Sequence, residues 1–213
     1  MEFSVTKSAL LDELTTTQGV VERKTTIPIL SNLLVEAKEN RLTITATDLE
    51  LSVRTSCEAK VKKDGAGTIP AKKLLELVRL LPEGEIKFKL LDNHWIEIVS
   101  DKKKYKMVGM AKENFPALPA MPHTLVKIPA VVLESLIAKT KFAISMEESR
   151  YTLNGEVRVL IPKKAMDEVE KLSAAAADGP ISIELKDEQS AGQMRPLADE
   201  NYRYRYVIMP MRI

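Results

Sequence analysis

Four times along the chain, a short β-prone run is followed by a break and then by an amphipathic helix. This recurrence constrains the fold more than any other feature, because copies of one small unit bury their apolar faces by assembling side by side. The openings span residues 3–14, 68–81, 127–137 and 159–172. The third interval is about half as long as the first two. We therefore expect a repeated unit whose third copy lacks two strands after Gly155.

Each of the first two units continues from its helix into three strands. Residues 41–46 and 49–54 alternate apolar and polar side chains, which is the period of half-buried antiparallel strands. In the second unit a Pro-Glu-Gly stop at 82–84 ends the helix, and three strands are expected at 86–91, 95–99 and 105–110. A turn is expected at 63–67. The repeated unit is therefore β-α-β-β-β, and the fold class is α+β.

A proline-rich stretch divides the chain. Residues 114–122 contain three prolines, a composition that favours an extended linker and disfavours a helix. We place the domain boundary there, with domains over 1–120 and 121–213. In the second part we expect helices at 129–140 and 163–177, a strand at 181–185, a poorly patterned stretch at 190–199 and a final strand at 202–213.

Composition excludes several classes of protein. The 213 residues are 45% hydrophobic and 29% charged, the balance of a soluble globular protein. The 32 basic and 30 acidic residues nearly cancel, so net charge gives no argument for a nucleic-acid partner. The single cysteine, Cys57, fits a reducing compartment, and we expect the cytoplasm. The sequence shows neither a signal peptide nor an apolar run of about 18 residues, so we expect no membrane association.

The sequence contains no convincing catalytic constellation. There is no glycine-rich phosphate loop and no Cys/His metal spacing, and His94 and His123 fall in a hairpin and a linker. Asp48 and Glu50 offer two carboxylates, but on a strand boundary this pattern is more typical of a turn and a solvated edge. An enzyme that uses these two carboxylates is the weaker alternative. We expect no metal, no cofactor and no catalytic residue.

Basic residues recur on the expected helices. Each cluster alone is typical of a solvated face, but equivalent places in a repeated unit would combine them into one strip suited to a phosphate backbone, without base readout. The strip comprises Lys72, Lys73, Arg79, Lys139, Lys141, Lys163, Lys164 and Lys171, and Arg23, Lys24, Arg150 and Tyr151 would extend it. The tail at 209–213 has two methionines, which suit either an adaptable peptide-binding surface or a core strand.

The order of several short motifs resembles the β sliding clamp of bacterial DNA polymerase III. The resemblance runs without interruption over residues 1–155, then over 156–188 as the end of the family's second domain and over 190–213 as the last strands of its third. The motifs are Pro-Ile-Leu at 28–30, Ser-Asn-Leu-Leu at 31–34, Thr-Ala-Thr-Asp-Leu-Glu at 45–50, Pro-Ala-Lys-Lys at 70–73, Leu-Leu-Pro-Glu-Gly at 80–84, Phe-Pro at 115–116, Arg-Tyr-Thr-Leu-Asn-Gly at 150–155 and the terminal Met-Pro-Met-Arg-Ile.

The resemblance implies a head-to-tail homodimeric ring of six similar domains, with helices facing a central hole that encloses duplex DNA and antiparallel sheets forming the outer wall. It implies no catalytic activity and no cofactor. Its partners would be duplex DNA, replicative polymerase subunits, the clamp loader and other proteins with clamp-binding motifs. Residues 1–120 would be a complete first domain, and 121–213 a shortened second domain fused to the last strands of the third.

The resemblance also assigns roles to individual residues. Arg23, Lys24, Arg150 and Tyr151 match positions that contact DNA in the family, and Lys72 joins them from the basic strip. The positions that match the partner-peptide groove are Leu153, Val207, Ile208, Met209, Pro210, Met211 and Arg212. On the first domain, Lys73, Leu77 and Met107 match the edge that meets the partner subunit.

The chain departs from the family's pattern after Gly155. The second-domain strand pair with its Thr-Asp-Gly-His-Arg-Leu run is absent, as is most of the third domain, including the helix that receives the neighbour's first domain. The sequence is thus an internally deleted clamp, an engineered miniature or a compilation of incomplete segments. Because groove and interface segments are missing, a second hypothesis is an interaction module that binds partner peptides without forming a closed ring.

Overall fold

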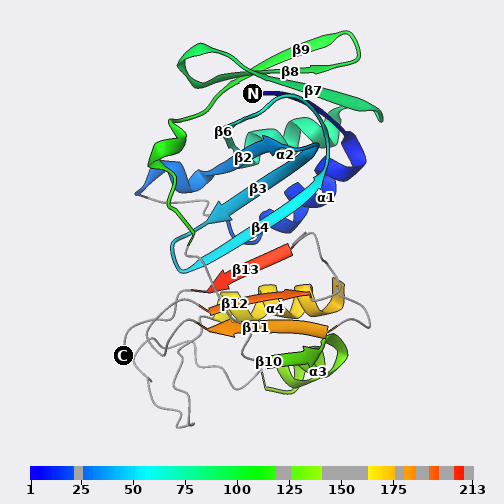
Figure 1. Cartoon of the computed structure of the whole chain (residues 1–213), viewed down its shortest axis with the longest axis vertical. Helices are drawn as coiled ribbons and strands as arrows, with labels where there is room; N and C mark the ends of the chain where they lie inside the picture. The colour runs from blue at the N-terminus through cyan, green and yellow to red at the C-terminus, as the bar shows by residue number, and fades with distance from the viewer. Residues whose placement is uncertain are drawn as a thin grey trace. The chain divides into compact units, whose positions relative to one another are not determined.

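The computed structural model of the chain describes residues 1–21, 26–118, 126–140, 163–175, 180–185, 192–196 and 204–208. The chain divides into two compact units (Figure 1). Unit 1 comprises Met1–Asp48 and Val53–Ala117, and unit 2 comprises Leu49–Ser52 and Leu118–Ile213. Each unit has its own strands and its own pair of helices, and they are described separately.

Unit 1 contains a five-stranded antiparallel sheet. Its strands, in spatial order, are β5 (Lys60–Lys63), β1 (Glu2–Thr6), β7 (Glu85–Leu90), β8 (Trp95–Ser100) and β9 (Lys103–Val108). On β7, Ile86 and Phe88 are buried between exposed residues. Phe88 stacks on Phe3 of β1 with ring centroids 4.9 Å apart. One face of the sheet is therefore apolar and the other meets solvent.

The other strands of unit 1 lie in the order β4 (Leu51–Glu58), β3 (Arg41–Thr47), β2 (Asn32–Lys38) and β6 (Gly65–Pro70). The 3₁₀ helix η1 (Pro28–Ser31) leads into β2. The turn expected at 63–67 is wrong except at Asp64, because Lys63 ends β5 and Gly65 already pairs with Ala37 in β6. Glycine is used here for close packing: a Cβ on Gly65 would lie 2.9 Å from the Met1 Cβ.

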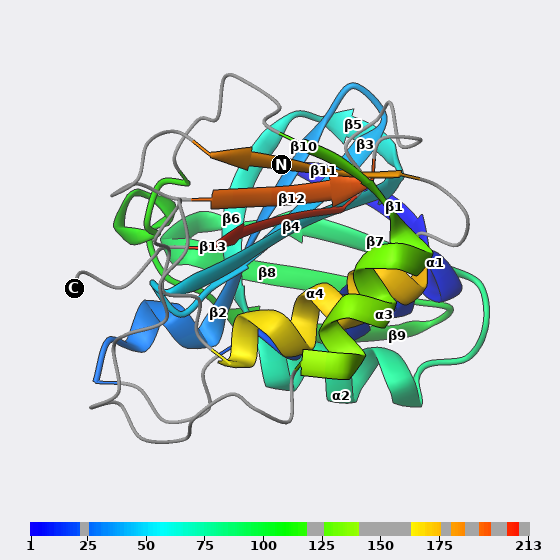
Figure 2. The ribbon, with the colours of Figure 1, turned by 90° about the horizontal axis from the view of Figure 1, so that it is seen from below.

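Two helices pack together against the strands of unit 1. Helix α1 (Lys7–Thr17) begins at Thr6, whose hydroxyl accepts a hydrogen bond from the Ala9 N–H, and helix α2 (Ala71–Leu80) follows Pro70. The two helices lie next to each other on the same side of β2–β4 (Figure 2). Their buried side chains, which form the core with the strands, are Leu10, Leu14, Leu74, Leu75 and Val78.

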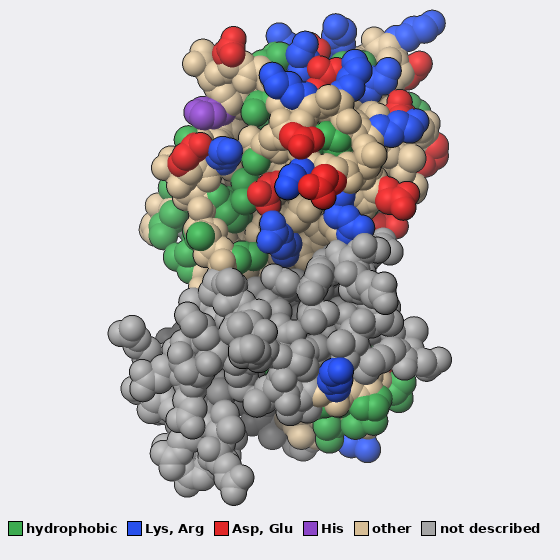
Figure 3. Space-filling model, in the orientation of Figure 1, with side chains coloured by type: hydrophobic (Ala, Val, Ile, Leu, Met, Phe, Trp, Pro, Cys, Tyr) green, Lys and Arg blue, Asp and Glu red, His purple; other side chains and the backbone are tan. Residues whose placement is uncertain are grey.

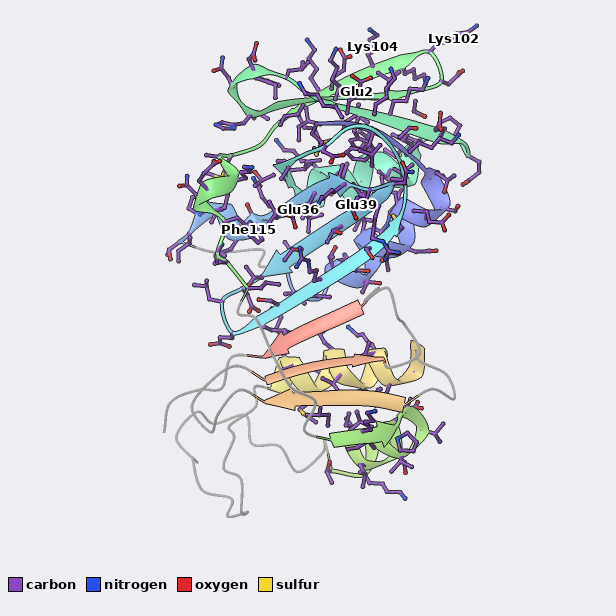
Figure 4. The ribbon with its side chains drawn as sticks, in the orientation of Figure 1. Glu2, Glu36, Glu39, Lys102, Lys104 and Phe115 are labelled. Atoms are coloured by element: carbon purple, nitrogen blue, oxygen red, sulfur yellow. The ribbon has the colours of Figure 1, made fainter. Side chains whose placement is uncertain are left out.

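The segment after β9 is fastened to unit 1. It includes the short helix η3 (Lys112–Asn114), and Phe115 then packs on Ile29 and Leu30 of η1 (Figure 4). Upstream, the Gly109 N–H donates to the His94 carbonyl, in the 3₁₀ helix η2 (Asp92–His94). The chain therefore runs along unit 1 beyond its last strand.

Unit 2 contains the antiparallel strand order β10 (Val126–Pro129), β11 (Pro180–Leu185), β12 (Gly192–Pro196) and β13 (Tyr204–Ile208). Strand β12 lies in the stretch at 190–199, for which the sequence predicted no regular element. Helices α3 (Ala130–Thr140) and α4 (Lys163–Ala175) pack on each other. The core consists of Ala130, Leu133, Ile137, Ala165, Val169, Leu172 and Ile181. Antiparallel sheets with paired helices in both units confirm the α+β fold class.

Candidate functional site

Helix α2 presents a mixed basic and apolar surface. Its buried stripe leaves Lys72, Lys73, Glu76, Arg79 and Leu80 exposed. The Lys72 Nζ lies 3.9 Å from the Glu76 Oε1, across one helical turn. Within the described part of the chain, Lys73 and Arg79 make no ion pair. The helix therefore offers two unpaired cations and a third that is weakly paired, all available to an anionic ligand.

Helix α1 adds no unpaired cation to this surface. Its exposed positions are Ser8, Asp12 and Thr15, and the exposed Gln18 follows as its C-cap. Its basic residue, Lys7, is largely buried and forms an ion pair of 3.0 Å with Glu83. The helical face of unit 1 is thus only weakly positive, and any attraction to phosphates comes mainly from α2.

In unit 2 the exposed face of α3 is apolar. Val131, Val132 and Leu136 are about half exposed, and Lys139 is the basic residue in the last turn. On α4, Lys164 and Lys171 are exposed, and the Lys171 Nζ lies 2.6 Å from Glu168 Oε1. The side chains of Lys141 and Lys163 lie outside the described set. The predicted basic strip thus remains a prediction, and α3 contributes little charge to it.

Several predicted site residues lie outside the described residues. For DNA contact these are Arg23, Lys24, Arg150 and Tyr151. Lys72, on α2, is the predicted DNA-contacting residue that lies within the described part of the chain. For the peptide groove they are Leu153, Met209, Pro210, Met211 and Arg212. Val207 and Ile208 end strand β13, where they pair with Gln193 and Gly192 of β12. The described segment Tyr204–Ile208 is therefore a sheet strand.

The three residues predicted for a subunit contact lie on two elements of unit 1. Lys73 and Leu77 are one turn apart on α2, and Met107 is on β9, the last strand in its sheet. Leu80, which is 85% exposed, lies three residues beyond Leu77 on the same helix. Sequence reasoning missed Leu80, although its i+3 spacing from Leu77 was the available signal.

The two carboxylates of the enzyme alternative lie outside the hollow described in unit 1. A hollow of about 560 Å³ in unit 1 is lined by β1, the β2–β3 turn and the β4–β5 connection, and neither Asp48 nor Glu50 lines it. Asp48 is half-exposed and Glu50 is exposed. Among the described residues, no group of three His, Cys, Asp or Glu side chains could hold a metal ion. A search of the same residues found no helix that is long and apolar enough to cross a membrane.

Solved structures share this arrangement of strands and helices. The sliding clamp of Bacillus subtilis superposes with a TM-score of 0.88 at 20% identity, over 100% of this chain and 65% of that one. A griselimycin-bound clamp from Bartonella birtlesii gives 0.86 at 29% identity, over 99% of this chain and 65% of that one. The fold is therefore that of the DNA polymerase sliding clamps.

Sequence comparison gives the family. The family described as DNA polymerase III beta subunit, N-terminal domain, matches residues 1–119. The beta sliding clamp of Chlamydia pneumoniae is 36% identical over 156 residues, and that of Caulobacter vibrioides is 37% identical over 164. Each alignment covers 73% of this chain, but only 43% and 42% of the respective relative. The chain belongs to the DNA polymerase III beta subunit family and spans less than half the length of these relatives.

Proposed function

We propose that the chain acts as a non-catalytic sliding clamp in the cytoplasm. It would encircle duplex DNA as a homodimeric ring and tether the replicative polymerase for processive synthesis. It would also dock the clamp loader and repair proteins. The observation that carries this proposal is the match of residues 1–119 to the family, over a unit that has its own complete core.

The weak positive charge of the helical face suits a sliding contact. Lys72, Lys73 and Arg79 on α2 would attract phosphates from a distance, while Asp12 and Glu76 reduce the attraction. Phosphate contacts carry no sequence information, and few of them give a loose, salt-sensitive association. Arg23, Lys24, Arg150 and Tyr151 complete the proposed DNA-contacting set.

The proposed subunit contact uses α2 and the open edge of β9. Lys73, Leu77 and Met107 form its predicted centre, and we add Leu80 because so exposed a leucine lies next to them. An edge strand with unpaired backbone groups can also pair with a strand of a second chain. The proposed partner-peptide groove comprises Leu153 and the tail from Val207 to Arg212.

A second candidate function is an interaction module that binds partner peptides but does not close a ring. The coverage of the relatives is the observation behind it, because the sequence aligns with only 43% of the Chlamydia pneumoniae clamp. This module would share the fold, the α2 surface and the tail with a clamp. It would differ in its oligomeric state and in how it holds DNA.

Light scattering and DNA topology distinguish the two functions. A ring predicts a particle of twice the 23.8 kDa chain mass, and a module predicts a monomer. Once loaded on a nicked circular plasmid, a ring stays bound through gel filtration and slides off when the plasmid is cut. A monomer, or retention that is the same on circular and linear DNA, would contradict the clamp proposal. Intact mass should equal 23.8 kDa if Gly155 and Glu156 are joined in the polypeptide.

A further inference from the structure

The solvent face of β7, β8 and β9 is rich in lysine. Alternate residues of each strand point to this face, and the pairing register aligns them across the sheet. Lys87 and Lys104 both pair with Val99, so they flank it, and Lys89 and Lys106 flank Glu97 in the same way. Trp95, on the same side of β8, is one pleat further along. We call these four lysines and Trp95 the lysine face.

The four lysines of this face outnumber the acid among them, Glu97, which lies between Lys89 and Lys106. Within the described part of the chain, none of them forms an ion pair. By contrast, Lys60 and Lys62 at the β5 side of the sheet are held by Glu85 at 3.1 Å and Glu2 at 3.0 Å. Figure 3 shows basic side chains gathered over β7–β9, and Figure 4 shows Lys102 and Lys104 extending outward. The acids of the sheet therefore leave an excess of positive charge on β7 and β9.

The spacing of these lysines fits an extended polyanion. Two residues along a strand are separated by about 7 Å, and strands two apart by about 10 Å. Lys87 and Lys89 are therefore about 7 Å apart along β7, and Lys104 and Lys106 are separated in the same way along β9. Two parallel rows of cations result, separated by the width of β8.

Trp95 supplies the second element of such a site. Its side chain is 42% exposed, beside the 48% exposed Val108 that pairs with it across the strands. A flat aromatic ring left open among cations is the combination by which proteins hold single-stranded nucleic acid, since bases stack on the ring while lysines contact phosphates. A duplex hides its base faces. An acidic peptide without aromatic residues would engage the lysines but would have no planar group to stack on the indole.

We infer that the lysine face binds single-stranded DNA. The phosphates lie along Lys87, Lys89, Lys104 and Lys106, and an unpaired base stacks on Trp95. DNA is the appropriate polymer because the chain belongs to a DNA polymerase subunit family. The site uses the outward side chains of the sheet, away from α2, and does not depend on whether a ring closes.

Trp95 is the single tryptophan of the chain, so its fluorescence reports on this face alone. Titration with an oligothymidylate of about 20 nucleotides at low salt should quench that fluorescence, because thymine stacks on the indole. A duplex of the same length should leave it unquenched. Absence of quenching by the oligothymidylate, or equal quenching by the duplex, overturns the proposal. Quenching by a polyglutamate peptide but not by the oligonucleotide would assign the face to an acidic protein segment instead.

Two variants test the charges and the ring separately, with a labelled oligothymidylate and fluorescence anisotropy. Lys87→Gln/Lys104→Gln should weaken binding several-fold and make the slope of log affinity against log salt shallower by about 1.4, since each lost phosphate contact removes about 0.7. Trp95→Ala should weaken binding about tenfold. The matched control, Lys38→Gln/Lys112→Gln, removes two exposed lysines from outside the face and should change neither value. Equal losses in the control and the test variant would refute the site.

Discussion

At the scale of single residues, the hydroxyl of Thr68 connects three parts of unit 1. It accepts hydrogen bonds from Asn32 Nδ2 at 3.1 Å and from the Met110 N–H at 2.7 Å, and it lies 2.9 Å from the Met110 carbonyl, to which it donates. Gly109 has no room for a side chain, because a Cβ there would lie 1.8 Å from the Thr68 carbonyl oxygen. One buried side chain thus fastens the segment after β9 to β6 and β2.

Replacing this hydroxyl should therefore destabilise unit 1. Thr68→Val keeps the shape of the side chain but leaves the buried Asn32 amide and the Met110 groups without their partner, at a cost of about 1–3 kcal/mol. The free energy of unfolding in urea measures this. Thr68→Ser retains the hydroxyl and should lose less than half as much. Equal losses in the two variants would show that the methyl group, and not the hydrogen bonds, stabilises the segment.

Two surface carboxylates link the stability of the five-stranded sheet to pH. Hydrogen bonds from Lys60, and then from Ser4, lower the pKa of Glu85 below its usual 4.5, and a hydrogen bond from Lys62 does the same for Glu2. A carboxylate with a lowered pKa in the folded state stabilises that state above its unfolded pKa. The contribution is lost as pH falls through the folded value.

The stability difference between the wild type and Glu2→Gln/Glu85→Gln should follow that sign. The variant should be less stable above about pH 5, and the difference should shrink to nothing as both carboxylates of the wild type become protonated below it. Urea unfolding at a series of pH values between about 2 and about 7 measures this stability difference. Asp12→Asn, at an exposed carboxylate without an ion pair among the described residues, is the control variant. A difference that grows toward acid pH would contradict the assignment.

At the scale of elements, α2 divides into a face that stabilises the fold and a face that is free to bind. Leu74 is 1% exposed and Leu80 is 85% exposed on the same helix. Leu74→Ala leaves a cavity in the core and should cost about 2–5 kcal/mol. Leu80→Ala should change the free energy of unfolding of the monomer by less than about 0.5 kcal/mol. Chemical unfolding at low protein concentration measures both, and a large loss at Leu80 would mean that it packs on the fold.

At the scale of the whole molecule, the proposed ring depends on contacts between two chains. If α2 and β9 form that contact, Lys73→Glu/Leu77→Ala should weaken dimerisation at least about tenfold, because it removes an apolar anchor and reverses a neighbouring charge. Light scattering over a concentration series measures the monomer–dimer equilibrium. Lys112→Glu, at another exposed lysine of unit 1, should leave it unchanged. A dimer that both variants leave intact would place the subunit contact elsewhere.

Hydrophobic periodicity in the sequence predicted most elements, because a strand with one buried face and a helix with one buried stripe each display a distinct repeat. Strands β3, β7 and β8 and helices α2 and α3 occur within one or two residues of their expected bounds. Strand β6 was missed at its start because Gly65 and Gly67 read as turn residues. Strand β12 was missed because Gly192–Pro196 has no alternation, and its pairing with β11 decides its conformation.

The sequence by itself determined the repeated α+β unit, the family resemblance and the lysines of α2, since these depend on local pattern and motif order. Only the tertiary structure decided which residues meet across strands. The register of β7, β8 and β9 sets Lys87 and Lys104 on either side of Val99 and turns Trp95 to the same face. Periodicity fixes which face a side chain occupies, but cross-strand neighbours depend on backbone pairing between distant segments, and no local pattern encodes that register.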